Sequence, residues 1–433
     1  MLFLYNILLP LVFLVYLPAF AWRQLRRGNF LPRCGERFGF YGNAKLAALK
    51  RLKAPVWIHA VSVGEAVAAL SFIRHWQALH PETDFVLSTT TTTGQATAQA
   101  RLPARAELIY CPFDLPFAVN RALRAIRPSM LAIFEVEIWP NLITRAARYG
   151  AKVVLANGRV SDRSAKGYAR HRWFFAPIFR RFALFCMQSD EDAARIRAVV
   201  GDAVPIRSCN TMKFDQIPDA DAQDKAAVLA DVFGPGPRLT LTAGSTHAGE
   251  EELVATVFKR LRETYRTLRL VLVPRHVERT AEVEAVLRKL GLTWRLLKPG
   301  ASGQVYEEPV EVLLVNTTGE LMAFYAAADV AYVGKSLAGN HGGHNIIEPA
   351  IFGKPILHGA HMENFRLVTA IFRKAAAAAE VPDDATLEPA LKLLLDKPAL
   401  RQELGRKARQ VVEANRGAIA RTIAALRELR GQG

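Results

Sequence analysis

The stretch GKSLAGNHGGHNIIEPAIFGKP, residues 334–355, is the most informative part of the chain for fold and function. It follows the run Asp329–Val333, which has the length and composition of a buried parallel strand. The segment Asn345–Ala350 has the pattern of a first helical turn, and a helix N-terminus favours phosphate. We therefore expect a strand–loop–helix unit that binds phosphate, with Glu348 accepting two vicinal ribose hydroxyls. The alternative is a structural connection with a solvated glutamate.

The same alternation of short apolar runs and helical patterns extends through most of the chain. With 433 residues the chain is too long for one compact core, so we expect two domains. Runs that read as strands are 56–61, 85–88, 108–110, 130–134 and 153–156, and then 239–243, 270–273, 310–314, 330–333 and 355–357. Strands separated by helices indicate βαβ units, parallel sheets and sites beyond the carboxyl ends of the strands. The sequence therefore predicts an α/β protein whose two Rossmann-like domains, 23–215 and 239–433, face a central cleft and are joined by a linker at 216–238.

The charge balance points to an anionic partner. The chain has 57 Lys and Arg against 40 Asp and Glu, a net charge of +17. An excess of this kind suits nucleic acid, an anionic membrane face or phosphorylated substrates. Because no nucleic-acid-binding module is recognisable, we expect the membrane and phosphate alternatives and no nucleic acid. The four scattered cysteines lack metal-ligand spacing and indicate reduced thiols in a cytosolic setting.

The N-terminal segment Met1–Trp22 carries no charged side chain and is long enough to span a bilayer. The arginines that follow it directly predict, by the positive-inside rule, that the rest of the chain is cytoplasmic. We therefore expect a membrane anchor at residues 1–22 in the cell inner membrane, with the catalytic domains on its cytoplasmic face. Pro10 and Pro18 also allow a shallow or tilted helix, and a cleaved signal peptide is the competing interpretation.

Charged residues in the first half fall just after predicted strands. Glu65 lies at a strand-to-helix junction, where a carboxylate can act as a general base or simply favour the helix N-terminus. Glu135 and Glu137 follow the strand 130–134 and would point to the same side if that strand continued, holding a substrate or an arginine. Lys213 precedes the linker and can stabilise a developing negative charge, or be an ordinary solvated lysine.

In the second half, Arg275 closes the strand 270–273, and arginine binds phosphate in a fork geometry. The segment Thr318-Gly319-Glu320 precedes a helix, and its backbone can lie against a nucleobase. The chain contains neither a GxGxxG fingerprint nor a Walker A sequence, which disfavours a dinucleotide oxidoreductase or a P-loop enzyme. No histidine spacing typical of a metal site occurs, and His341 with His344 favours loop structure or phosphate contact over metal binding.

With these motifs in order, the chain resembles the 3-deoxy-D-manno-octulosonic acid (Kdo) transferases of lipid A biosynthesis in Gram-negative bacteria. The resemblance covers essentially the whole chain, including the apolar N-terminus. It rests on VSVGE at 61–65, STTTTTGQATA at 88–98, FEVEIWPN at 134–141, NGRVSDRSAKGY at 157–168, GSTHAGEEE at 244–252, PRHVER at 274–279 and GGHNIIEPA at 342–350. Two small departures, NGRV where Ala-Arg is common and Ile347 in the final motif, remove no charged group.

The resemblance implies a GT-B fold and the transfer of Kdo from CMP-Kdo to a lipid A precursor (lipid IVA), with inversion at the anomeric carbon. It assigns the catalytic base to Glu65, and leaving-group or transition-state support to Glu135 and Lys213, with Glu137 as an alternative to Glu135. Its CMP contacts fall on Pro274, Arg275, Thr318, Gly319, Glu320, Asn345, Ile346, Ile347 and Glu348.

We expect no metal or other cofactor, because Arg275, Lys213 and the helix start at Asn345 can together stabilise the leaving phosphate. Two acidic triplets occur, of which Asp190–Asp192 has the pattern of a helix start capped by Ser189, and 219–221 lies in the predicted linker. Two other functions stay open: a GT-B enzyme that uses a UDP-sugar as a transferase or epimerase, and a non-enzymatic membrane protein that binds anionic lipid.

Overall fold

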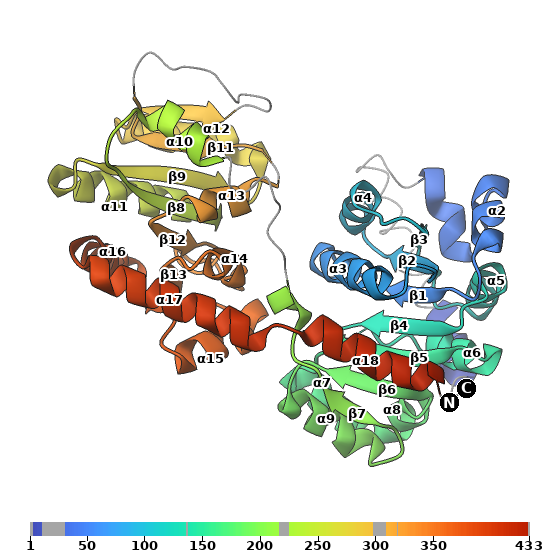
Figure 1. Ribbon diagram of the computed structural model, residues 1–433. Coiled ribbons are helices and arrows are strands. Elements are labelled where there is room, and N and C mark those ends of the chain that lie inside the picture. The colour runs from blue at the N-terminus through green and yellow to red at the C-terminus, as the bar shows by residue number, and fades with distance from the viewer. Residues whose placement is uncertain are drawn as a thin grey trace. The chain divides into compact units, whose positions relative to one another are not determined.

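The computed structural model describes residues 3–10, 31–135, 137–215, 225–297, 309–317 and 319–431. The chain divides into two compact units, one formed by Met1–Gln216 with Gly417–Gly433 and the other by Ile217–Arg416 (Figure 1). Each unit is built on a parallel sheet of seven strands, and helices cover both faces of each sheet. The α/β class with two Rossmann-like units therefore agrees with the prediction.

The first unit has the strand order β3-β2-β1-β4-β5-β6-β7. Its central strands are buried along their whole length, as is typical of a parallel sheet covered on both faces. The strands are β1 (Val56–His59), β2 (Phe85–Thr89), β3 (Ala106–Tyr110), β4 (Met130–Phe134), β5 (Lys152–Gly158), β6 (Phe182–Met187) and β7 (Ile206–Ser208). The helices are η1 (Leu31–Phe38), α2 (Asn43–Arg51), α3 (Val63–Leu79), α4 (Thr92–Ala100), α5 (Pro116–Ile126), α6 (Pro140–Tyr149), α7 (Asp162–Arg170), α8 (Arg172–Phe179), α9 (Asp190–Val200), η2 (Met212–Asp215) and α18 (Ala418–Gly431).

The second unit has the strand order β10-β11-β9-β8-β12-β13-β14. The strands are β8 (Leu239–Thr246), β9 (Leu268–Pro274), β10 (Trp294–Leu297), β11 (Val312–Val315), β12 (Val330–Val333), β13 (Ile356–Gly359) and β14 (Ala379–Val381). The helices are α10 (Lys225–Phe233), α11 (Glu250–Thr264), η4 (Val277–Arg279), α12 (Thr280–Lys289), α13 (Leu321–Ala326), α14 (Ile347–Ile351), η5 (Glu363–Phe365), α15 (Arg366–Lys374), η6 (Asp384–Thr386), α16 (Leu387–Asp396) and α17 (Pro398–Asn415). Loops after β8, β9, β11 and β12 therefore emerge at one edge of the sheet, because these strands are parallel neighbours.

The ten strands expected from apolar runs are present, with shifts of a few residues at their ends. Four more strands, β6, β7, β10 and β14, were missed. Among them β7 and β14 have only three residues each and lie at the edges of their sheets, so they leave little pattern in the sequence.

The predicted linker at 216–238 is only partly a linker. Residues 216–224 lie outside the described part, whereas α10 forms a regular helix whose Leu229, Val232 and Phe233 are buried in the second unit. The predicted linker begins with a polar stretch that contains a proline, so the apolar face of the helix that follows was not recognised. The correction moves residues 225–238 into the second unit.

The C-terminal helix was also misassigned, because the predicted second domain extended to residue 433. The helical stretch ends at Asn415 and restarts as α18, which packs on α3, β6 and η2 of the first unit (Figure 1). Its Ile419, Ile423 and Leu426 are buried in the core of that unit. An apolar helix face shows that a helix is buried, but the sequence alone does not identify the sheet that covers it.

At the N-terminus, residues 3–10 are helical. The Tyr5 hydroxyl donates to Asp114 at 2.9 Å, and the Asn141 side-chain amide donates to Asn6 at 2.6 Å, so this helix packs on the first unit. Of the helices in the described ranges, none combines the length and apolar character that a membrane crossing needs. The rest of the predicted anchor, residues 1–2 and 11–22, lies outside those ranges.

Candidate active site

Glu65 occupies the third position of α3 and is buried at the helix start. Ser62 and Glu65 form a capping box, in which Ser62 Oγ accepts the Glu65 amide and donates to Glu65 Oε1 at 2.8 Å. Glu65 Oε2 accepts the amide of Val61 at 2.8 Å. The predicted strand-to-helix junction is correct, and Glu65 lies in the first turn of the helix, as the structural alternative also required.

Packing around this turn explains the threonine-rich motif that follows β2. A Cβ on Gly94 would lie 3.3 Å from the carbonyl oxygen of Val61, so a larger residue would press on the turn that holds Glu65. Thr91 donates its hydroxyl to the same carbonyl at 3.1 Å and also caps α4. The turn at 61–65 and the threonine-rich segment at 88–98 therefore pack together at the ends of β1 and β2.

Glu135, Glu137 and Lys213 share one electrostatic environment with Glu65. Burial raises the pKa of Glu135, the positive charge of Lys213 opposes this, and Glu65 adds to it. Burial and Glu65 also raise the pKa of Glu137. Burial lowers the pKa of Lys213, and Glu135 partly restores it. Three carboxylates and a lysine, separated by up to 148 positions, are thus close enough to influence one another's protons.

The condition for Glu135 and Glu137 to point to the same side, a continued strand, is not met. β4 ends at Phe134, and Glu135 has a left-handed φ of 59°, so the extended backbone is interrupted at Glu135. A non-glycine residue in this region is uncommon and often lies at a functional site. Arg159, which was not singled out from the sequence, also lies close enough to lower the pKa values of Glu135 and Lys213.

Lys213 lies in η2, a single short turn. A residue of the first-unit sheet binds the start of this turn. Asn157, near the end of β5, has a φ of 53°, and its side-chain oxygen accepts the amide of Met212 at 3.0 Å. The polar motif at 157–168 therefore supports the turn that carries Lys213. Nearby, Ser189 caps α9 by accepting the amide of Asp192, which confirms the structural interpretation of the acidic triplet 190–192. The second triplet, 219–221, lies outside the described residues.

In the second unit, Glu250 organises the glycine-rich loops, and sequence reasoning missed it. This fully buried carboxylate accepts the amides of His247, Lys335, Ser336 and Leu337 and the hydroxyl of Tyr332, at 2.7–3.1 Å. A Cβ on Gly334 would lie 2.9 Å from the Glu250 carboxylate and 2.6 Å from the Ser245 carbonyl. The loop after β8 and the loop after β12 are therefore held together by one carboxylate, and the glycine allows their close approach.

A basic cluster lies on these loops. His247 and His344 approach within 3.0 Å through their Nε2 atoms, and the His276 ring packs edge-on against His247. Burial, with the charges of Arg275, His247, Lys335 and His276, lowers the pKa of His344 to about 3. The positive charges of Arg275 and Lys335 beside this ring, rather than its burial, are what would favour an anion here. Arg275 was predicted here, whereas Lys335 and His247 were not.

The predicted ribose residue Glu348 lies in the first turn of α14. This helix has only five residues, so the phosphate-binding helix start expected from the sequence is shorter than assumed. Burial raises the pKa of Glu348 to about 7, while a hydrogen bond from Asn345 and the charge of Arg275 lower it. The structure thus brings Arg275, Asn345 and Glu348 together. Ile346 and Ile347, by contrast, are buried side chains and offer only their backbone to a ligand.

The remaining predicted contacts lie at the same edge of the sheet. Pro274 ends β9, and Gly319 with Glu320 precedes α13. Gly319 has a φ of 91°, and Glu320 accepts the Thr317 hydroxyl at 2.8 Å. Thr318 lies outside the described residues. Gly319 therefore supplies a turn that a larger residue would strain.

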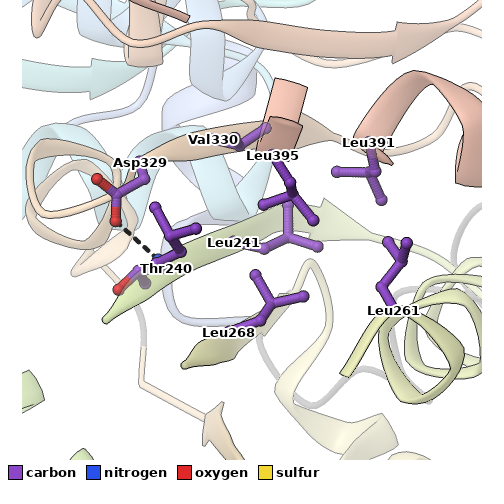
Figure 2. A pocket seen from close by; sticks show the side chains of 9 residues that line it. Thr240, Leu241, Leu261, Leu268, Asp329, Val330, Leu391 and Leu395 are labelled. Atoms are coloured by element: carbon purple, nitrogen blue, oxygen red, sulfur yellow. Dashed lines mark hydrogen bonds between the residues drawn. The ribbon is translucent and has the colours of Figure 1, made fainter. Parts of the chain in front are cut away.

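A small apolar cavity lies at the opposite edge of the second sheet. Figure 2 shows leucine side chains of β8, β9, α11 and α16 around it, beside the hydrogen bond from the Thr240 amide to Asp329 at 2.7 Å. The strand residues that line the cavity lie at the starts of β8, β9 and β12, whereas the candidate site lies where these strands end. The cavity is thus a gap in the core and not a substrate pocket.

Comparisons with known proteins agree with this arrangement. Two full-length structural likenesses are a UDP-GlcNAc 2-epimerase from Neisseria meningitidis (TM-score 0.59, 10% identity, 86% of this chain and 100% of that one) and a glycosyltransferase from Rickettsia africae (TM-score 0.55, 12% identity, 87% and 98%). At these identities they establish the fold alone, which is the GT-B fold of two parallel-sheet units.

The family follows from sequence. Residues 32–216 match the family model described as 3-deoxy-D-manno-octulosonic-acid transferase (kdotransferase). The chain is 33% identical to the enzyme of that name from Bordetella pertussis, over 98% of this chain and 97% of the relative, and 30% identical to that from Haemophilus influenzae, over 92% of each. The chain belongs to the 3-deoxy-D-manno-octulosonic acid transferase family, and it is a glycosyltransferase.

Proposed function

We propose that this protein transfers Kdo from CMP-Kdo to a hydroxyl of a lipid A precursor, lipid IVA, with inversion at the anomeric carbon. Family membership across nearly the whole chain supports Kdo as the transferred sugar. The observation that carries the mechanism is the shared environment of Glu65, Glu135 and Lys213 in the first unit.

Glu65 acts as the general base in this proposal. Its Oε2 accepts one backbone amide, so it keeps a lone pair for the acceptor hydroxyl. The carboxylate takes the hydroxyl proton while the acceptor oxygen attacks the anomeric carbon of Kdo. The bond from that carbon to the phosphate oxygen breaks, and CMP leaves with the electron pair. Glu135 and Lys213, or Glu137 in place of Glu135, support the charge that develops.

The second unit supplies the nucleotide contacts. Arg275 and the neighbouring basic cluster suit the phosphate of CMP. Their positive charges can contact the phosphate directly, with no metal ion between them. Glu348 accepts the ribose hydroxyls, and the backbone of Gly319, Glu320 and Asn345–Ile347 lines the nucleoside. These groups can stabilise the leaving CMP, so we propose that transfer needs no metal.

The protein works at the cytoplasmic face of the inner membrane in this proposal. The helix at residues 3–10 exposes Phe3, Leu4, Ile7 and Leu8 while its polar residues bind the first unit. Exposed apolar side chains and a net charge of +17 suit an anionic lipid surface. Replacing Ile7 and Leu8 by Asp should reduce cosedimentation with phosphatidylglycerol vesicles, and unchanged cosedimentation would count against this part.

The donor and acceptor are tested by mass spectrometry of products formed from lipid IVA and a nucleotide sugar. We expect a mass increase of one or more Kdo residues with CMP-Kdo and none with UDP-GlcNAc. Products from UDP-GlcNAc but not from CMP-Kdo would replace this proposal with the UDP-sugar alternative. Lipid binding without any product from either donor would support the non-enzymatic alternative.

A further inference from the structure

A second cluster of ligating side chains lies beside the glycine-rich loop and has no part in the proposed transfer. His341 belongs to that loop, whereas His361 and Glu363 follow β13. Each of the three offers a ligand atom, and these atoms lie within 4.8 Å of one another. We propose that His341, His361 and Glu363 form a binding site for a divalent transition-metal ion such as Zn²⁺. The site goes beyond the proposed function and does not depend on it.

The spacing of the ligand atoms fits a small tetrahedral ion. Glu363 Oε1 lies 3.7 Å from His341 Nδ1 and 3.4 Å from His361 Nδ1. Zinc bonds of about 2.1 Å at tetrahedral angles separate neighbouring ligand atoms by about 3.4 Å. Both carboxylate-to-nitrogen distances are therefore close to the separation in a zinc coordination shell, and the ligand atoms of the two histidines lie within 4.8 Å of each other.

The donor set selects the class of metal. Two imidazoles and one carboxylate favour zinc, nickel, cobalt or copper over magnesium and calcium, which prefer oxygen ligands. Three protein ligands leave one coordination position for water. The three side chains are 62%, 43% and 41% exposed, in the order His341, His361 and Glu363, so an ion can enter from solvent.

The two chain segments that carry the ligands are already joined. Glu363 Oε2 accepts the amide of Gly342 at 2.7 Å, which leaves Oε1 facing the histidines. The Asn364 amide donates to the Gly342 carbonyl at 2.9 Å. Gly342 has a φ of 112°, and a Cβ there would lie 2.6 Å from the side-chain amide of Asn364. The ligand positions are thus held by backbone contacts, and a bound ion would further tie the glycine-rich loop to the segment after β13.

The test uses the full chain without a polyhistidine tag, stripped with a chelator and titrated with Zn²⁺ by calorimetry and with Co²⁺ by visible absorption. We expect one equivalent of metal, a tetrahedral Co²⁺ spectrum and a higher Tm with Zn²⁺. His361→Ala and Glu363→Gln should each weaken binding by about tenfold or more. His171→Ala, which removes an exposed histidine of the first unit, should bind like the wild type.

Two outcomes would overturn the proposal. One is binding that His361→Ala and Glu363→Gln leave unchanged, or no binding at all. The other is binding lost in His344→Ala but kept in His361→Ala, which would place the ion on the His247–His344 pair instead. Neither readout needs donor or acceptor, so failure here is distinct from failure of the proposed transfer.

Discussion

The carboxylate of Asp215 accepts a 2.6 Å hydrogen bond from the backbone amide of Gly417, which lies 202 positions further along the chain. Its second oxygen accepts the amide of Ile419, also at 2.6 Å. These amides open α18, where a helix start leaves its first N–H groups without partners. Because Asp215 ends the turn that carries Lys213, the C-terminal helix and this lysine are positioned by the same carboxylate.

Replacing Asp215 by Ala should therefore destabilise the protein. The change leaves the buried amide of Ile419 and the partly buried amide of Gly417 without this acceptor, which costs about 1–3 kcal/mol in the free energy of unfolding. Urea denaturation measures this loss. Asp202→Ala is the control, because its side chain is 99% exposed and should change stability by less than about 0.5 kcal/mol. Equal stability of the two variants would contradict the capping role.

Glu65 can be tested separately as a base and as a capping residue. Glu65→Gln keeps an oxygen that accepts the Val61 amide but removes the base, so we expect the kcat of transfer to fall by about 10²–10⁴. Ser62→Ala removes the other half of the capping box and keeps the carboxylate. It should cost about 1 kcal/mol of stability and less than about tenfold in kcat. If both variants lose activity equally, Glu65 matters through the helix start and not through proton transfer.

How far the sequence could predict this site depends on the distance along the chain between the groups involved. Glu65 and its helix start are local, so the strand-to-helix position was correctly predicted from five residues. The proximity of Lys213 to Glu135 joins positions 78 apart, and no local pattern contains it. The resemblance to a family supplied that pairing. The capping of α18 by Asp215 lies outside both kinds of reasoning, since it depends on which sheet the last helix covers.

The burial of Glu250 is a feature that its position in the sequence did not indicate. An acidic residue in the first turn of a helix suits a solvated position. The structure instead buries Glu250 completely under amides from two loops. A fully buried carboxylate needs such partners. Four of the five donors come from residues more than 80 positions away, which a pattern of nine residues cannot include.

Replacing Glu250 by Gln should weaken both stability and CMP binding. The new amide group would face backbone N–H donors that now bind a carboxylate, so we expect a loss of about 3 kcal/mol or more. Because both loops of the basic cluster rest on Glu250, CMP affinity should fall at the same time. Glu252→Gln is the matched control, since this glutamate forms only a surface ion pair with Lys289 among the described contacts. Unchanged CMP affinity in Glu250→Gln would contradict the organising role.

Stability should also depend on pH through Glu348. Burial raises the pKa of this carboxyl from an ordinary 4.5 to about 7 in the folded protein. Between these values the folded protein keeps the proton and the unfolded chain has lost it, so the free energy of unfolding falls as pH rises from 4.5 towards 7. Above pH 7 the stabilisation is gone. Urea denaturation at pH 5 and pH 8 should show a loss in the wild type on the order of 1–3 kcal/mol larger than in Glu348→Gln.

The charge of Arg275 provides a second check that Glu348 makes stability depend on pH. Arg275 lowers the pKa of Glu348, so Arg275→Ala should raise that pKa further and extend the loss of stability to higher pH. Arg266→Ala is the control, because it removes an exposed arginine elsewhere in the same unit. The same Arg275→Ala variant should bind CMP more weakly, since it loses the fork that suits the phosphate. A pH profile that is the same in Arg275→Ala as in the wild type would show that Arg275 and Glu348 are not electrostatically coupled, and would separate the proposed phosphate contact from the proposed ribose contact.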